Sequence, residues 1–275
     1  MNPLLKALQL KARQQVYTLL SGQNFSRLHG EGYDFSELRE YHIGDDIRKI
    51  NWMITAKLKK PYIKELHANR ELSVVVATLM DASLYFGSGN SKQKKLTEVA
   101  TLLAYATQQN NDLFTGICYT QNLTYAPVPT KQLYAIEQFS KTLFETPLLG
   151  TTLKYQASID NLFIRIHKPS LVFVLGDFLE FVDLSLLAQK HEVIAIIIRH
   201  REEETPKPLG ETLLHNPKNN KKLETYFEKQ TFQNYLNKLK ENDEKIQQHL
   251  SSYNIRYMTI FTDEDALKKL LTLFI

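Results

Sequence analysis

Two patterns of apolar and polar residues alternate along most of the chain. Short apolar runs rich in β-branched residues predict buried strands, and apolar residues spaced three and four apart predict helices. Strands are expected at Leu72–Met80, Leu113–Tyr119, Leu123–Ala126, Leu171–Gly176, Val193–Ile198 and Arg256–Phe261. Helices are expected at Lys92–Gln109, Lys131–Phe144, Thr152–His167, Val182–Lys190, Glu224–Leu250 and Asp265–Phe274. This alternation indicates an α/β fold, with a mostly parallel sheet flanked by helices.

Residues 1–70 follow a different pattern. Pro3–Leu20 has the spacing of an amphipathic helix, whereas Asn24–Arg70 mixes glycines, charged residues and aromatic residues without a sustained period. We interpret the second stretch as an irregular extension with short strands, the last near Tyr62–Leu66. The predicted organisation is therefore an N-terminal helix and irregular segment over residues 1–70, packed on an α/β domain over residues 71–275. Asn216–Lys222 is expected to be an exposed loop.

Composition and charge narrow the class of protein. Of the 275 residues, 43% are hydrophobic and 23% are charged, which is typical of a globular protein. The net charge of +4 is mild, and the lysines between Lys218 and Lys240 are interleaved with acids, which favours a solvated face over a nucleic-acid surface. The single cysteine, Cys118, is expected to be buried. We predict no membrane span and no signal peptide, and therefore a cytoplasmic location.

Acidic and hydroxyl side chains follow the ends of two predicted strands. Asp81 and Ser83 come directly after one buried strand, and Asp177 comes directly after another. Thr151 lies just before a predicted helix. Because loops at the carboxyl ends of parallel strands share one edge of a sheet, these oxygens are expected to converge. Such a set suits a hard cation such as Mg²⁺ or Mn²⁺. The alternative is that the aspartates only make turns or cap helices.

This set resembles the metal-ion-dependent adhesion site of von Willebrand factor A domains. In that family the first motif is Asp-x-Ser-x-Ser; Asp81 and Ser83 match it, but Tyr85 stands where the final serine belongs. Thr151 matches the family's threonine and Asp177 its last aspartate. A phenol projects its oxygen too far to replace a serine hydroxyl. The resemblance therefore implies a von Willebrand factor A-like domain with a degenerate site, where Mg²⁺ or Mn²⁺ is optional.

A longer motif lies upstream of the first strand. It reads G-x-G-x-D-F-x-x-L-R-x-Y and then G-D-D-x-R-x-I-x-W, and it resembles the signature of the bacterial "domain of unknown function 58" family. That family combines the signature with a von Willebrand-like domain in the same order. We interpret the motif as a structural network of ion pairs, with aromatic residues that anchor it to the sheet domain. Its residues are Gly32, Asp34, Phe35, Arg39, Tyr41, Gly44, Asp45, Asp46, Arg48 and Trp52.

The same resemblance implies a function. Members of the family are associated with MoxR-type AAA+ ATPases and with the maturation or assembly of other proteins. The hypothesis is a protein-interaction module, not an enzyme, whose edge at Asp81, Thr151 and Asp177 docks a protein partner. The alternative is a metal-assisted hydrolase that uses the acidic signature segment. Against it, the sequence has no nucleophile elbow, phosphate-binding loop or HExxH motif.

Overall fold

The protein is described by a computed structural model. It describes residues 2–21, 35–42, 45, 47, 50–66, 72–86, 91–121, 123–206, 210–219, 221–227 and 229–273. The chain forms two compact units: Met1–Thr18 with Leu72–Ile275, and Leu19–Glu71. Within the described residues, no helix combines the length and apolarity that crossing a membrane requires.

The large unit is built on one six-stranded sheet with the order β10-β7-β6-β3-β4-β5. Its strands are β3 (Ser73–Leu79), β4 (Leu113–Tyr119), β5 (Leu123–Tyr125), β6 (Leu171–Gly176), β7 (Glu192–Arg199) and β10 (Arg256–Phe261). All neighbouring pairs are parallel except β4 with β5, which is antiparallel. The predicted mostly parallel sheet is confirmed. The chain passes from β3 to β4 on one side and later returns to β6 on the other, so the sheet order switches beside β3, where α/β proteins place their sites.

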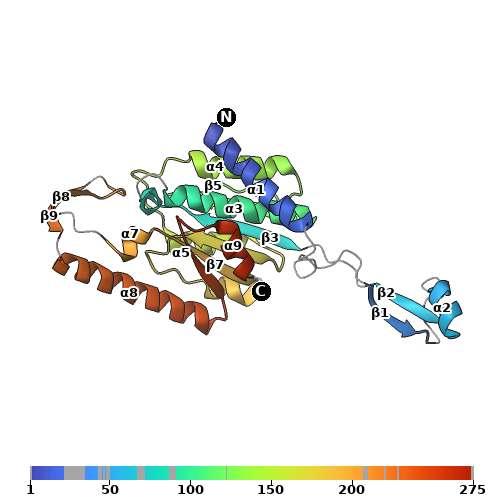
Figure 1. Ribbon diagram of the computed structural model, residues 1–275. Coiled ribbons are helices and arrows are strands. Elements are labelled where there is room, and N and C mark those ends of the chain that lie inside the picture. Colours follow the sequence, from blue (N-terminus) through green and yellow to red (C-terminus); the bar gives the residue numbers. More distant parts are fainter. Residues whose placement is uncertain are drawn as a thin grey trace. The chain divides into compact units, whose positions relative to one another are not determined.

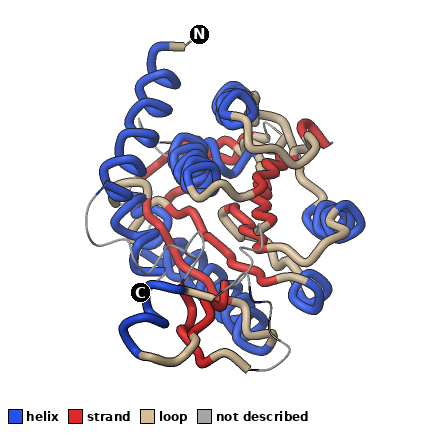
Figure 2. The backbone as a smooth tube through the Cα atoms, turned by 90° about the vertical axis from the view of Figure 1, so that its right-hand side faces the viewer, coloured by secondary structure: helices blue, strands red, loops and turns tan. Residues whose placement is uncertain are grey.

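Helices cover both faces of this sheet (Figures 1 and 2). One face packs against α5 (Tyr155–Arg165), α6 (Ser185–Lys190) and α8 (Lys229–Ser252), which share a buried core with β3, β6 and β7. The other face carries α3 (Lys92–Gln109), which contacts α4 (Leu133–Glu145) and α9 (Ala266–Leu273). The apolar runs of the central strands are continuous because both of their faces are buried.

The first helix, α1 (Pro3–Ser21), packs on the large unit. Leu5, Ala12 and other apolar residues along it are buried. Gln9 Nε2 donates to the carbonyl of Glu137 in α4 at 3.1 Å. The sequence analysis grouped this helix with the signature segment, both packed on the α/β domain. In the structure, contacts group the residues up to Thr18 with the sheet.

One prediction downstream of β7 is wrong. Residues 224–227, expected to begin a helix, instead belong to an antiparallel hairpin of β8 (Gly210–His215) and β9 (Lys222–Phe227). The loop expected at Asn216–Lys222 is confirmed in its described residues up to Lys221, which join these two strands. A short helix, α7 (Arg201–Glu204), precedes the hairpin, and α8 begins only at Lys229. The helical period of α8 was extended too far upstream, because the charged residues of β9 fit an exposed helix face as well as an exposed strand.

The small unit contains β1 (Phe35–Glu40) paired antiparallel with β2 (Tyr62–Leu66), and helix α2 (Trp52–Leu58). The strand expected near Tyr62 is confirmed, whereas α2 was not predicted. Asn51 caps this helix by accepting a hydrogen bond from the backbone N–H of Ile54 at 3.4 Å. Lys59 ends it in the left-handed conformation, with φ of 56°. A helix of seven residues is too short to show a helical period in the sequence.

Candidate functional site

Both strand-end aspartates are buried at one edge of the sheet. Asp81 follows β3 and Asp177 follows β6, and these strands are direct neighbours in the sheet. The Asp81 side chain has an exposed fraction of 0% and that of Asp177 1%. A carboxylate at this depth needs compensating charge or hydrogen bonds, because burial penalises its ionised form. The partners of these two groups therefore define what the edge can do.

Asp81 is held by its own loop and by a loop more distant in sequence. Its Oδ1 accepts a hydrogen bond from the backbone N–H of Ser83 at 3.0 Å, which caps the short 3₁₀ helix η2 (Ala82–Tyr85). Its Oδ2 accepts one from the backbone N–H of Leu153 at 3.3 Å. Oδ2 also lies 2.9 Å from the ammonium of Lys218. The helix-capping alternative is thus realised, together with an ion pair that the sequence did not reveal.

Asp177 faces a fully buried lysine. Its Oδ2 lies 2.9 Å from Nζ of Lys92, the first residue of α3. Burial raises the pKa of Asp177, but the Lys92 ammonium and the neighbouring Ser83 hydroxyl outweigh it, so that the pKa is lowered overall. Asp177 is therefore a stable anion, not a proton donor near neutral pH.

The Lys92 ammonium bridges two carboxylates. Besides Asp177, it lies 2.6 Å from Oε1 of Glu203, another buried side chain. Glu203 belongs to the capping box of α7, and its Oε2 accepts the backbone N–H of His200 at 2.9 Å. Sequence reasoning missed both residues, because a lysine at the start of a helix and a glutamate in an acidic run look like solvated groups. The only signal in the sequence was the position of each residue: Lys92 follows Ser91, and Glu203 comes shortly after β7.

The second ammonium comes from the loop between β8 and β9. Lys218 Nζ lies 2.6 Å from Oε1 of the exposed Glu180, in addition to its contact with Asp81. Desolvation lowers the pKa of Lys218, but its hydrogen bonds to Glu180 and Asp81 outweigh it, so that the pKa is raised overall. The loop is fixed beside the site because the carbonyl of Pro217 accepts the backbone N–H of Gly150 at 2.8 Å.

The hydroxyl groups of the expected metal site have mixed surroundings. Ser83 Oγ is buried beside Asp177 and Tyr155, influencing the pKa of both, although it makes no hydrogen bond of standard geometry among the described residues. Thr151 Oγ1 donates to the carbonyl of Leu148 at 2.7 Å. The side chain of Tyr85 is 55% exposed. The structure thus brings Asp81, Ser83 and Asp177 together, while the Thr151 hydroxyl is engaged in its own loop.

These donors do not fit a divalent cation as they stand. An oxygen of Asp81 and an oxygen of Asp177 each already contact an ammonium. Across the residues that the structure describes, there is no group of three or more His, Cys, Asp or Glu side chains suited to a metal ion. A metal would have to displace a lysine from a carboxylate, at the cost of a buried positive charge without a partner.

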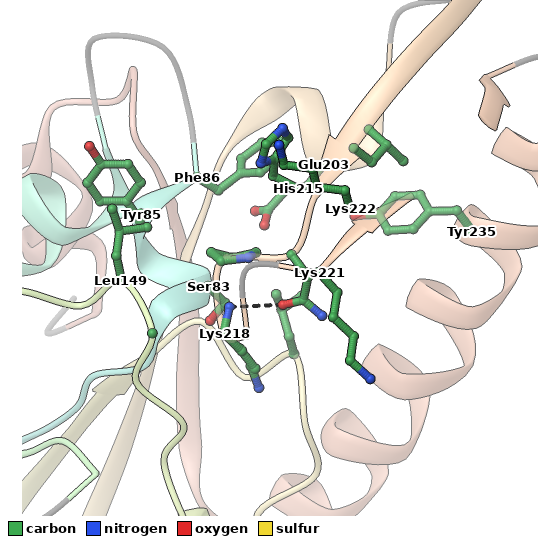
Figure 3. A pocket seen from close by; sticks show the side chains of 15 residues that line it. Ser83, Tyr85, Phe86, Leu149, Glu203, His215, Lys218, Lys221, Lys222 and Tyr235 are labelled. Carbon is green, nitrogen blue, oxygen red and sulfur yellow. Dashed lines mark hydrogen bonds between the residues drawn. The ribbon is translucent and has the colours of Figure 1, made fainter. Parts of the chain in front are cut away.

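A hollow of about 1310 Å³ opens beside the site (Figure 3). Exposed apolar side chains on one side of it include Tyr85, Phe86 and Leu149. The hairpin provides the other side, including the lysines Lys218, Lys221 and Lys222 together with His215. Ser83 and Glu203 also line the hollow, so it borders both ion pairs. The arrangement can accommodate a ligand or protein segment that combines apolar groups with negative charge.

The signature residues are only partly described. Gly32, Asp34, Gly44, Asp46 and Arg48 lie outside the described residues. Phe35 and Arg39 belong to β1, but their side chains are not described.

Among the described signature residues, Asp45 Oδ2 accepts the backbone N–H of His42 at 2.9 Å, and the backbone N–H of Tyr41 donates to the carbonyl of Pro61 at 2.8 Å. These local bonds are consistent with a structural role. Trp52 is the first residue of α2, and its side chain is 67% exposed. Anchoring of the segment to the sheet by Trp52, Tyr41 and Phe35 stays a prediction.

Comparison with solved structures gives only weak likenesses. BatB, a conserved hypothetical protein from Bacteroides thetaiotaomicron, is 10% identical, with a TM-score of 0.46 over 74% of this chain and 96% of that chain. An uncharacterized membrane spanning protein from Vibrio fischeri is 13% identical, with a TM-score of 0.23 over the same shares.

Uncharacterized proteins from Mycobacterium bovis and Mycobacterium tuberculosis are 26% identical to this chain over 221 residues, which covers 77% of this chain and 69% of each relative. The family described as "Protein of unknown function DUF58" matches residues 37–245, which include the later part of β1, both strand-end aspartates and the hairpin. This match spans most of the chain and confirms the predicted resemblance to this family. The chain therefore belongs to the DUF58 family.

Proposed function

We propose that this chain is a protein-interaction module whose larger part is a von Willebrand factor A-like domain, and that the hollow beside Asp81 and Asp177 is its docking surface. The β3–β6 switch point supports this assignment, because α/β domains place binding sites at such points. The strand-end motif, a degenerate form of a metal-ion-dependent adhesion site, lies at the same edge. The docked partner is a MoxR-type AAA+ ATPase, and the complex acts in the maturation or assembly of other proteins.

The observation that carries the proposal is the composition of the hollow. Exposed aromatic and aliphatic side chains gather on one side, where Tyr85, Phe86 and Leu149 line it. Clustered exposed apolar side chains are typical of protein interfaces, in which aromatic residues often dominate the binding energy. Exposed Lys221 and Lys222 on the facing hairpin add positive charge. The occupant that fits is an acidic segment of the partner with at least one apolar anchor.

The hydrolase alternative gains less support. Glu40, in the acidic signature segment, pairs with Lys60 at 2.9 Å. Both side chains are substantially exposed, and the hydrogen bond and charge of Lys60 lower the pKa of Glu40. A general acid or base near neutral pH needs the opposite environment for a carboxylate, since burial without a cation raises its pKa. Glu40 therefore does not favour a second function.

The test is direct binding between the purified full chain and a purified MoxR-type ATPase from the same organism. Tyr85→Ala with Phe86→Ala removes apolar anchors, and we expect affinity to fall at least about 30-fold, since hot-spot aromatic residues contribute about 2 kcal/mol or more. Lys221→Glu with Lys222→Glu is expected to weaken binding most at low salt. Lys141→Glu, at an exposed lysine of α4 that does not line the hollow, is a charge-reversal control. Unchanged affinity in both double variants would reject the hollow as the docking surface.

A further inference from the structure

The strand-end edge contains two ammonium groups where a metal ion is the expected source of positive charge. Lys92 is fully buried at the start of α3, and Lys218 is 25% exposed in the hairpin loop. Each contacts one of the two strand-end aspartates at 2.9 Å. Each also contacts a glutamate at 2.6 Å: Lys92 contacts Glu203, and Lys218 contacts Glu180. Together the two lysines supply a charge of +2, the same as one divalent ion.

The surroundings of Lys92 suit a cation. Its ammonium contacts two carboxylates that are themselves nine-tenths or more buried, and it lies 5.8 Å from the centroid of the Phe86 ring. An aromatic face at that distance attracts a cation. A buried ammonium without such partners is strongly unfavourable, so its position depends on the contacts with Asp177 and Glu203. Lys92 is thus part of the fold and not an exchangeable surface group.

The surroundings of Lys218 differ from those of Lys92. It is carried by the loop between β8 and β9, and its second partner, Glu180, is exposed. Asp81, by contrast, is fully buried and receives backbone hydrogen bonds from Ser83 and Leu153. Removing Lys218 would leave the Asp81 carboxylate with no cation among its described contacts. That carboxylate would then favour any small cation able to enter from the hollow.

We propose that Lys92 and Lys218 are built-in cations that replace the divalent ion of a strand-end metal site, so that this site works without metal. Lys92 is the fixed half, and Lys218 is the half brought in by the hairpin. The carboxylates retain their affinity for a cation and bind one from solution only when a lysine is removed. This inference is independent of the partner, and it holds whether or not the hollow docks a protein.

The experiment compares Mn²⁺ binding by the purified full chain and by Lys218→Ser, using isothermal titration calorimetry and the melting temperature. The wild-type chain is expected to show no saturable binding and no Mn²⁺-dependent shift. Lys218→Ser is expected to bind one Mn²⁺ and to melt at a higher temperature in its presence, because a ligand that binds only the folded state stabilises it. Adding Asp81→Asn to Lys218→Ser is expected to abolish both effects. Lys221→Ser is the matched loop control.

A metal-free measurement tests the fixed half. Lys92→Met keeps the length of the side chain and removes its charge, and we expect the melting temperature to fall by about 10 °C or more, as for a broken buried ion pair. Lys141→Met, on an exposed face of α4, is expected to change it little.

Three results would overturn the proposal. One is Mn²⁺ binding by the wild-type chain that Asp81→Asn removes. Another is no gain of Mn²⁺ binding in folded Lys218→Ser. The third is a melting temperature of Lys92→Met equal to that of the wild type. If Lys92→Met does not fold, the large loss of stability is the expected direction, and the two Mn²⁺ tests still decide.

Discussion

The ammonium of Lys218 lies 2.9 Å from Oδ2 of Asp81 and thereby joins the β8–β9 hairpin to the end of β3. We expect Lys218→Met to lower the free energy of unfolding by about 2 kcal/mol, because a buried carboxylate loses its cation but keeps two backbone hydrogen bonds. Urea unfolding measures the change. Lys221→Met, in the same loop but exposed, is expected to stay within about 0.5 kcal/mol of the wild type. Equal losses in both variants would contradict the role of the ion pair.

Asp177 is expected to make the stability of the fold depend on pH in the acidic range. Its pKa in the folded protein is lowered, mainly because the Lys92 ammonium outweighs the effect of burial. As the pH falls, Asp177 therefore takes up a proton in the unfolded chain before it does so in the folded protein. The stability that Asp177 contributes above the ordinary pKa of about 3.9 is lost as the pH falls below that value. We predict that the melting temperature of Asp177→Asn is lower at neutral pH and falls less steeply between about pH 5 and pH 3. Parallel profiles would show that Asp177 contributes nothing to this dependence.

His191 is expected to act in a different pH window. It is buried directly before β7, and neither ring nitrogen has a hydrogen-bond partner among the described residues. Burial, with a contribution from Lys190, lowers the pKa of His191. Its unfolded form therefore gains a proton first as the pH drops below about 6.5, which destabilises the fold. We expect His191→Leu to remove part of the loss in melting temperature between about pH 7 and pH 5. His167→Leu, at an exposed position, is the control.

Gly116 in β4 has no room for a side chain. A Cβ atom there would lie 2.6 Å from the ring of Phe139 and 2.9 Å from the ring of Phe114. We expect Gly116→Ala to destabilise the fold by about 1–3 kcal/mol through overpacking. Gly150→Ala is a useful contrast, because that site is open but has a φ of +79°. Its cost should come from backbone strain alone and should be about 1 kcal/mol. Chemical denaturation of both variants checks these values.

Cys118 is expected to be unreactive in the folded protein. Burial raises the pKa of its thiol to about 12, and the side chain lies inside β4. Since the thiolate is the reactive form, a thiol reagent at pH 8 should modify it only after the sheet opens. The rate of labelling should therefore rise in urea together with the loss of folded structure. Rapid labelling in native buffer would show that the strand is accessible.

The parallel sheet could be predicted from sequence because its central strands are short, uninterrupted apolar runs. The burial of Val74–Met80 on both faces of the sheet produces that run, and the bounds of α3 and β4 were predicted residue by residue. The strand-end aspartates were also predictable, since each follows directly after such a run. These features depend on local sequence, so one chain is enough to find them.

The partners of the aspartates could not be predicted in the same way. Lys92 and Glu203 come from segments rich in charge, where most side chains are solvated, and only the fold brings them to Asp177. Lys218 was hidden in a stretch interpreted as an exposed loop. Nothing in that stretch distinguishes a lysine that pairs with Asp81 from its neighbours Lys221 and Lys222, which are exposed. Pairing over such sequence separations is a property of the tertiary structure.

The late position of Lys218 in the chain gives the site an order of assembly. A ribosome makes β3, Asp81 and β6 long before it makes the hairpin, so the nascent sheet has an aspartate without its lysine. Until Lys218 emerges from the ribosome, the Asp81 carboxylate has a lower free energy in contact with water than buried at this edge of the sheet. The edge can therefore close fully only after most of the chain has been synthesised. Truncation before the hairpin is expected to leave this edge open even where the strands upstream of it have paired.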